Sequence, residues 1–319
     1  MTTARNQLIS TEATSYYHCV SRCVRRSFLC GEDNVTQKNY EHRRDWIVKK
    51  IHVLSRAYCI DICAYAIMSN HYHLVVHINK DRAIAISPRE VVERWSLLHK
   101  LPLLIQKWIN HDLTSKLEEE KCLEIIEQWR ECLWNLSWYM KELNFDIACR
   151  ANLEDKCTGH FWESRFKSQA LLDEKALAAA MAYVDLNPIR AGIADKPETS
   201  TYTSVKARID ALEKHLPNAP CLHPFVGNPT NIMLEGIPFR LKDYLELVDW
   251  TARHLRPNKA SMDSSLPPIF QRLGCNIDKW LKVCTSLENK KSTAIGSKSQ
   301  AVAIKPILNK QRIHCYFLE

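Results

Sequence analysis

Two short segments carry the side chains best suited to chemistry. His71 and His73 stand two residues apart in an apolar run typical of a β-strand, so both imidazoles point to one face. Tyr183 and Asn187 stand four residues apart and share one face if their segment is helical. Two imidazoles and an amide oxygen can hold a divalent cation with positions open for substrate. A tyrosine beside that cation is a candidate nucleophile for a phosphodiester.

The segment around Tyr183 is predicted to be a helix that Asp173 caps and that runs at least to Asp185. Pro188 disfavours a helical conformation at Asn187, so the last turn is expected to be distorted. The plainer interpretation of Tyr183 is a packed aromatic ring with a solvated hydroxyl, and that of the histidines is a hydrogen-bonded surface pair. Small residues on the neighbouring turn predict space for a substrate strand, namely Ala176, Ala179 and Ala180.

Four segments form a recognisable series in the order Tyr16-Tyr-His-Cys-Val-Ser-Arg22, Met68-Ser-Asn-His-Tyr-His73, Gly159-His-Phe-Trp-Glu-Ser-Arg-Phe-Lys-Ser168 and Tyr183-Val-Asp-Leu-Asn-Pro-Ile-Arg-Ala-Gly192. This series resembles the REP-associated tyrosine transposases, which are single-tyrosine members of the insertion-sequence-200-like HUH transposase superfamily. The resemblance covers roughly residues 14–208 and does not extend to the C-terminal third of the chain.

The resemblance implies an enzyme that nicks and rejoins single-stranded, hairpin-forming DNA of the REP type. Tyr183 would be the catalytic nucleophile, taking the 5′ phosphate and leaving a free 3′ hydroxyl, and a metal would be held by His71, His73 and Asn187. The cofactor would be Mg²⁺ or Mn²⁺, and Mn²⁺ competes because Mg²⁺ prefers oxygen ligands. A covalent intermediate conserves the phosphodiester energy, so no nucleotide cofactor is expected. The 7 glycines form no glycine-rich phosphate loop, which agrees with that expectation.

Basic and aromatic side chains in and beside these segments are candidate DNA contacts. They are Arg22, Arg25, Arg26, Phe161, Trp162, Arg165, Lys167 and Arg190. The formal charge of +8 and the pI near 8.8 favour a nucleic-acid partner. The alternative for the two aromatic residues is packing in the core at a strand start.

Two other functions compete with the strand-transfer enzyme. One is a non-catalytic protein that binds hairpin DNA and descends from such a transposase. The other is a metal-dependent hydrolase that uses His71, His73 and His77 with water as nucleophile. Intact metal-binding and tyrosine positions favour the strand-transfer enzyme, because a pure binder has no need of them. A hydrolase, unlike the strand-transfer enzyme, would form no covalent adduct with DNA.

The composition indicates the cellular compartment in which the protein is expected. No apolar run reaches about 18 residues, so no membrane span or membrane partner is expected. The first residues, Met-Thr-Thr-Ala, lack a hydrophobic signal core, so export is not expected. Thirteen cysteines without a repeating framework predict free thiols in a reducing compartment. We therefore expect a cytoplasmic, nucleoid-associated protein.

The pattern of elements predicts an α+β fold. Strands are expected at residues 14–24, 60–68, 71–78 and 166–172, and helices at 33–57, 88–109, 116–148 and 173–185. This order is compatible with a ferredoxin-like βαββαβ antiparallel sheet. The resemblance implies the same fold, an HUH endonuclease core with the histidine strand central and the tyrosine helix packed across it.

The domain organisation is predicted as residues 1–210 for the HUH single-tyrosine domain, with a helical insertion at about 85–148, then a linker at 211–235 and a C-terminal helical extension at 236–319. Residues 289–312, which carry six basic and no acidic residues, are either a solvated tail or a phosphate-binding arm. An apolar seam along 116–148 packs on 88–109 or joins a second copy in a homodimer.

Overall fold

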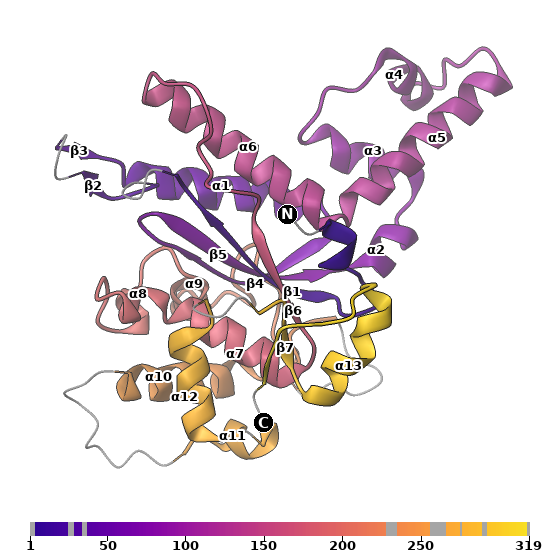
Figure 1. Ribbon diagram of the computed structural model, residues 1–319. Coiled ribbons are helices and arrows are strands. Elements are labelled where there is room, and N and C mark those ends of the chain that lie inside the picture. The colour runs from indigo at the N-terminus through magenta and orange to yellow at the C-terminus, as the bar shows by residue number, and fades with distance from the viewer. Residues whose placement is uncertain are drawn as a thin grey trace.

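A six-stranded sheet forms the centre of the computed structural model, with the strand order β4-β5-β1-β6-β7-β8 (Figure 1). The structure describes residues 4–24, 29–33, 37–227, 235–255, 266–274, 276–288 and 292–317. The strands of this sheet are β1 (Tyr16–Arg22), β4 (Ile60–Ile67), β5 (His71–Ile78), β6 (Lys167–Leu171), β7 (Ala294–Gly296) and β8 (Cys315–Phe317). Helices and strands both contribute, which confirms the predicted α+β class.

The sheet is mixed rather than antiparallel throughout. Strand β5 pairs antiparallel with β4 and β1, and β1 pairs antiparallel with β6. Strands β7 and β8 add to the β6 edge in parallel, so the prediction of an antiparallel sheet holds only for the first four strands. The register places His71 opposite Arg22 and His18 opposite both Val75 and Gln169, which puts these side chains on one face.

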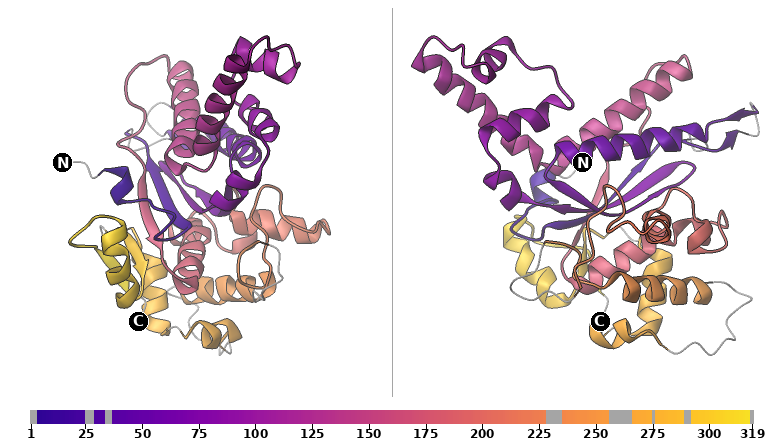
Figure 2. Two further views of the ribbon diagram at one scale, coloured as in Figure 1. Left: turned by 90° about the vertical axis from the view of Figure 1, so that its right-hand side faces the viewer. Right: turned by 180° about the vertical axis from the view of Figure 1, so that it is seen from behind.

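Different helices cover the two faces of the sheet (Figure 2). Helices α1 (His42–Ala57) and α6 (Leu136–Glu154) share one apolar core with Tyr72, Leu74 and Val76 of β5. Alternate residues of a strand point to opposite faces, so the histidines of β5 face the other layer, where α7 (Glu174–Asp185) lies. Helix α1 begins at His42, and Asp33, its predicted cap, lies in β2 (Glu32–Asp33), which pairs with β3 (Lys38–Asn39).

Helix α7 is buried on every side. All of its residues from Ala176 to Asp185 are buried, as expected for a helix that is apolar all round. The predicted space beside Tyr183 is therefore filled, because Ala176, Ala179 and Ala180 all belong to the same packed core. The predicted cap is confirmed, since the Asp173 side chain accepts a hydrogen bond from the backbone N–H of Ala176 at 2.7 Å.

Four helices form a lobe that projects from the sheet (Figure 1). They are α2 (Lys80–Ala85), α3 (Pro88–Ser96), α4 (Leu103–Ile109) and α5 (Lys116–Leu133), and α3 to α5 share a separate apolar cluster. Both long helices of the prediction are broken, at Pro102 before α4 and at Asn135, which caps α6. The apolar seam is thus divided between the lobe and the sheet core and is used within the chain.

The C-terminal third is part of the main structure. Its helices are α9 (Ser204–Glu213), α10 (Leu241–His254), α11 (Pro268–Leu273), α12 (Ile277–Ser286) and α13 (Lys298–Ile307). Short helices earlier in the chain are η1 (Arg5–Gln7), α8 (Asn187–Arg190) and η2 (Pro197–Thr199). Helices α10 and α12 pack on α7, in one apolar core.

This packing differs from the predicted helical extension with a basic tail. The described residues after 291 include β7 and β8, so they extend the sheet, while residues 289–291 lie outside the described part. A core shared across the predicted linker argues against an independent C-terminal unit. Among the described residues, no helix is long and apolar enough to cross a membrane.

Candidate functional site

The structure brings His73 and Asn187 into contact. Strand β5 places His73 fully buried beneath α7, and its Nε2 lies 2.7 Å from Asn187 Nδ2. Asn187 does not continue α7 but begins the short helix α8, after Leu186 at φ −90° and ψ 0°. This break agrees with the distortion predicted from Pro188. Two predicted site residues, 114 positions apart in the chain, therefore meet.

Tyr183 lies over the same pair. Its ring centroid is 5.6 Å from that of His73, in an edge-on arrangement. Arg190 Nη2 lies 3.3 Å from both the Tyr183 hydroxyl and Asn187 Oδ1, and its guanidinium carbon is 4.1 Å from the centre of the Tyr183 ring. Arg190, predicted as a DNA contact, is thus bound to the candidate nucleophile.

The environment of Tyr183 favours the neutral phenol. Burial and, to a smaller extent, the Glu288 carboxylate raise the pKa of Tyr183 to about 12, although Arg190 opposes them. The side chain is only 1% exposed. A DNA strand can therefore reach this hydroxyl only if the residues that cover it move.

His18 extends the site and was missed in the sequence. Its Nε2 lies 3.0 Å from His73 Nδ1, and its Nδ1 lies 2.7 Å from Gln169 Oε1. Gln169 Nε2 donates to Ser292 O and Oγ, which fixes the amide orientation. The Gln169 oxygen accepts from His18 Nδ1–H, so His18 Nε2 accepts from His73 Nδ1–H, leaving a lone pair on His73 Nε2. Burial lowers the pKa of His18 and that of His73, which keeps both rings neutral.

Glu288 is a second residue that the sequence did not reveal. It follows α12, and its Oε1 lies 3.8 Å from His73 Nε2 while its Oε2 lies 3.7 Å from an Arg22 nitrogen. His71, His73 and Glu288 each offer one ligand atom, and these three atoms lie within 4.8 Å of one another. Asn187 Oδ1 accepts a hydrogen bond from Arg190, and its Nδ2 is the atom that faces His73. The oxygen that faces the imidazoles in this arrangement is therefore that of the Glu288 carboxylate.

These residues fit a divalent cation. His71 Nδ1 lies 2.5 Å from Asn70 Oδ1, whereas its buried Nε2 has no hydrogen-bond partner among the described residues. Burial lowers the pKa of His71 to about 4, so its ring is neutral near pH 7. An orphaned imidazole nitrogen, the lone pair of His73 Nε2, which accepts from Asn187 Nδ2 when no metal is bound, and a nearby carboxylate form a donor set typical of Mn²⁺ or Zn²⁺.

The other residues predicted to contact DNA differ in their exposure to solvent. Arg165 and Lys167 are exposed, and Arg25 and Arg26 lie outside the described residues. Phe161 is 2% exposed and packs in the core, so the alternative of core packing applies to it and a base cannot stack there.

Trp162 borders a groove between α6 and the segment before β6, on the face of the sheet that α6 covers. It is half-buried, and its Nε1 donates to Asn144 O at 2.7 Å. The groove has a volume of about 810 Å³, and its lining includes Lys141, Phe145 and Arg165. A solvent-exposed groove with aromatic and basic side chains is suited to nucleic acid.

His77 does not join His71 and His73, although it is on the same strand. Its Nδ1 lies 3.1 Å from Asp61 Oδ2, beside His223. The three-histidine site of the hydrolase hypothesis is therefore not formed.

No family model matches the chain, and no curated protein matches it. A search of solved structures found similarity to a structure described as a REP-associated tyrosine transposase bound to a REP hairpin. The two chains are 12% identical, with a TM-score of 0.39, and the match covers 76% of this chain and 99% of the other. This similarity does not establish a family for the chain.

Proposed function

We propose that this protein is a divalent-metal-dependent DNA transposase or endonuclease of the single-tyrosine HUH type. It nicks and rejoins single-stranded, hairpin-forming DNA through a covalent 5′-phosphotyrosine on Tyr183. The observation that carries this proposal is the meeting of Tyr183, Asn187 and Arg190 with the buried imidazole of His73. The order β4-β5-β1-β6, with α1 and α6 on one face, supports the ferredoxin-like core that goes with it.

The metal would be held by His71 and His73, with Asn187 as the predicted third ligand and Glu288 as a further one. Such a cation stabilises a phenolate and offsets charge that builds on the scissile phosphate. The hydrogen bonds from Gln169 through His18 hold the His73 ring with its Nε2 lone pair toward the site. Support of this kind fixes the tautomer of a metal-binding histidine.

In the proposed reaction the Tyr183 oxygen forms a bond to phosphorus as the bond from phosphorus to the 3′ oxygen breaks. The phenolic proton passes to solvent, and the departing 3′ oxygen takes a proton from solvent and becomes a 3′ hydroxyl. Rejoining is the reverse attack by a 3′ hydroxyl, so no nucleotide is consumed. Arg190 assists because its positive charge, next to the hydroxyl, lowers the pKa of Tyr183 against the effect of burial.

The DNA would lie in the groove beside Trp162 on the α6 face of the sheet, and its scissile strand would pass the end of β1 to reach Tyr183 on the other face. Phe145 is 67% exposed there, and an exposed ring that stacks on a base contributes about 1–3 kcal/mol without sequence preference. Arg165 and Lys167 would neutralise phosphates near the same edge. We expect this activity in the cytoplasm, on nucleoid DNA.

The experiment incubates the full chain with Mn²⁺ and a labelled single-stranded hairpin, then separates the products on a denaturing gel. The wild type should give a covalent protein–DNA band. Tyr183→Phe should abolish this band with hairpin affinity nearly unchanged, because only the hydroxyl is lost. Tyr202→Phe is the matched control and should retain the band.

Metal-ligand variants sharpen the same assay. His73→Ala should remove the covalent band, whereas His77→Ala should retain it, because His77 lies with Asp61 and His223 instead. A covalent band that persists in Tyr183→Phe would overturn the assignment of the nucleophile. Nicking without any adduct would indicate a hydrolase.

A non-catalytic hairpin-binding protein is the second candidate. The near-complete burial of the Tyr183 side chain favours it, because a nucleophile must be reached by its substrate. Hairpin binding by the wild type without nicking or adduct, in Mn²⁺ and in Mg²⁺, would support this candidate over the enzyme.

A further inference from the structure

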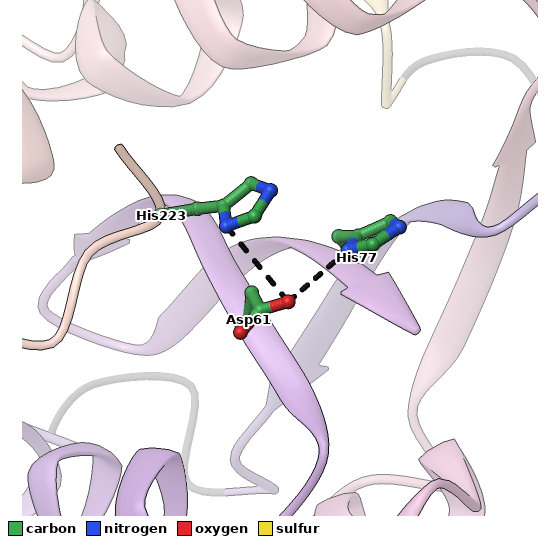
Figure 3. Close-up of side chains that lie close together, drawn as sticks. All are labelled: Asp61, His77 and His223. Atoms are coloured by element: carbon green, nitrogen blue, oxygen red, sulfur yellow. Dashed lines mark hydrogen bonds and ion pairs between the residues drawn. The ribbon is translucent and has the colours of Figure 1, made fainter. Parts of the chain in front are cut away.

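A second cluster of metal-binding side chains lies at the opposite end of β5 from His71. It consists of Asp61 in β4, His77 in β5 and His223, which follows α9 (Figure 3). The register pairs Asp61 directly with His77 across the two strands. His77 is four residues from His73, which corresponds to about 13 Å along a strand. The cluster is therefore separate from the site around Tyr183.

The backbone holds His223 in place over this strand pair. Its N–H donates to Ile62 O at 2.8 Å, and Leu222 makes a parallel bridge with Ile62. Arg208 reaches the His223 carbonyl at 3.4 Å. The segment predicted to be a linker thus carries a fixed imidazole to the edge of the sheet.

The three side chains converge on one point. His77 Nδ1 lies 3.1 Å and His223 Nδ1 lies 3.8 Å from the same oxygen, Asp61 Oδ2 (Figure 3). Tetrahedral zinc with bonds of about 2.0–2.1 Å separates its ligand atoms by about 3.3 Å. The distance from His77 is slightly shorter than this separation and the distance from His223 is slightly longer. All three ligand atoms lie within 4.8 Å of one another.

His223 has the properties of a ligand that lacks its partner. It is only 6% exposed, and its Nε2 is buried without a hydrogen-bond partner in the part of the chain that the structure describes. Its Nδ1 is too far from Asp61 for a hydrogen bond. Burial lowers the pKa of His223 to about 4, so near neutral pH the ring is uncharged and forms no ion pair with the carboxylate.

Asp61 presents its Oδ2 to the two histidines, and this oxygen accepts a hydrogen bond from His77 Nδ1 when no metal is bound. Arg82 Nη1 binds the other oxygen, Oδ1, at 2.9 Å, which fixes the carboxylate as an outer-shell partner of a metal ligand does. A cavity of about 420 Å³ borders both histidines and is lined by Glu12, Lys80, Asp81 and Glu235, among others. Glu235 is hydrogen-bonded to Asn79, and solvent in the cavity can complete the coordination.

We infer that Asp61, His77 and His223 form a binding site for a zinc-class divalent cation. Two imidazoles and one carboxylate are a known zinc donor set, with the fourth position open to water. Binding clamps the segment that carries His223 to strands β4 and β5. This inference is independent of the proposed DNA chemistry, which uses His71 and His73.

The test is a calorimetric Zn²⁺ titration of full-length protein after EDTA treatment and dialysis. The starting variant is His71→Gln/His73→Gln, which removes the other cluster. It should bind one Zn²⁺, and adding His223→Gln should weaken binding about a hundredfold or more, because losing outer-shell support alone costs about 10- to 100-fold. No Zn²⁺ binding by the starting variant, or undiminished binding after His223→Gln, would overturn the inference.

A second measurement covers the case in which His223→Gln folds poorly. Thermal unfolding of the starting variant should shift upward with Zn²⁺, and Asp61→Asn in the same background should remove this shift. The absorption spectrum of bound Co²⁺ should show the intense visible bands of tetrahedral coordination. A Zn²⁺-induced shift that survives Asp61→Asn, or a Co²⁺ spectrum without tetrahedral bands, would contradict the site. Loss of the DNA adduct has no bearing on these readouts, so the two proposals fail separately.

Discussion

Replacing Tyr244 with Phe should destabilise the protein, because its hydroxyl joins the C-terminal third to the helix that carries Tyr183. The hydroxyl donates to Asp185 Oδ2 at 2.6 Å, and both side chains are fully buried. The other carboxylate oxygen, Oδ1, accepts from Ser204 Oγ and the Val205 N–H. Hydrogen bonds to charged groups contribute about 1.5–3 kcal/mol, so we expect a loss of about 2 kcal/mol near pH 7. Urea denaturation monitored by circular dichroism measures it.

The matched control is Tyr58→Phe. Tyr58 is also fully buried, but its hydroxyl has no hydrogen-bond partner within the described residues, so its removal should cost nothing or stabilise slightly. Burial raises the pKa of Asp185, whereas the bond from Tyr244 lowers it, so the cost of Tyr244→Phe should shrink as acid protonates the carboxyl. Equal destabilisation by the two substitutions, or none by Tyr244→Phe, would refute this account of the contact.

Two further predictions concern the whole chain. Truncation after residue 215 should give an aggregated or unfolded protein by size-exclusion chromatography and circular dichroism, because it removes β7, β8 and the helices that pack on α7; a soluble, folded product would restore the predicted boundary. Burial lowers the pKa of His71 and that of His223 to about 4, from 6.5, so the unfolded chain binds protons that the folded one does not. The unfolding free energy of the EDTA-treated protein should be constant above about pH 6.5 and fall by about 3 kcal/mol per histidine toward pH 4, as denaturation at a series of pH values checks.

Local signals predicted the elements that have clear periodicity. The histidine hairpin, the strand before Asp173 and the helix after it lie where the apolar patterns and the cap placed them. Strands β7 and β8 have three residues each, too few for an alternation to be recognised. The break before α4 has a visible cause in Pro102, whereas the break at Asn135 interrupts an apolar seam that continues through it, so only tertiary packing reveals it.

Some residues of the candidate site could be predicted from the sequence, whereas others take their place only through the packing of distant segments. His18 was within reach of sequence reasoning, because pairing the first strand with the histidine strand puts His18 and His73 on one face. Glu288 was not, since its position depends on α12 packing against α7 through Trp280, Val283 and Leu287. Those contacts are apolar and place a carboxylate beside His73 only as a result of the whole fold. The C-terminal third therefore completes the site, and a protein cut back to the recognisable motifs would lack both the packing of α7 and this carboxylate.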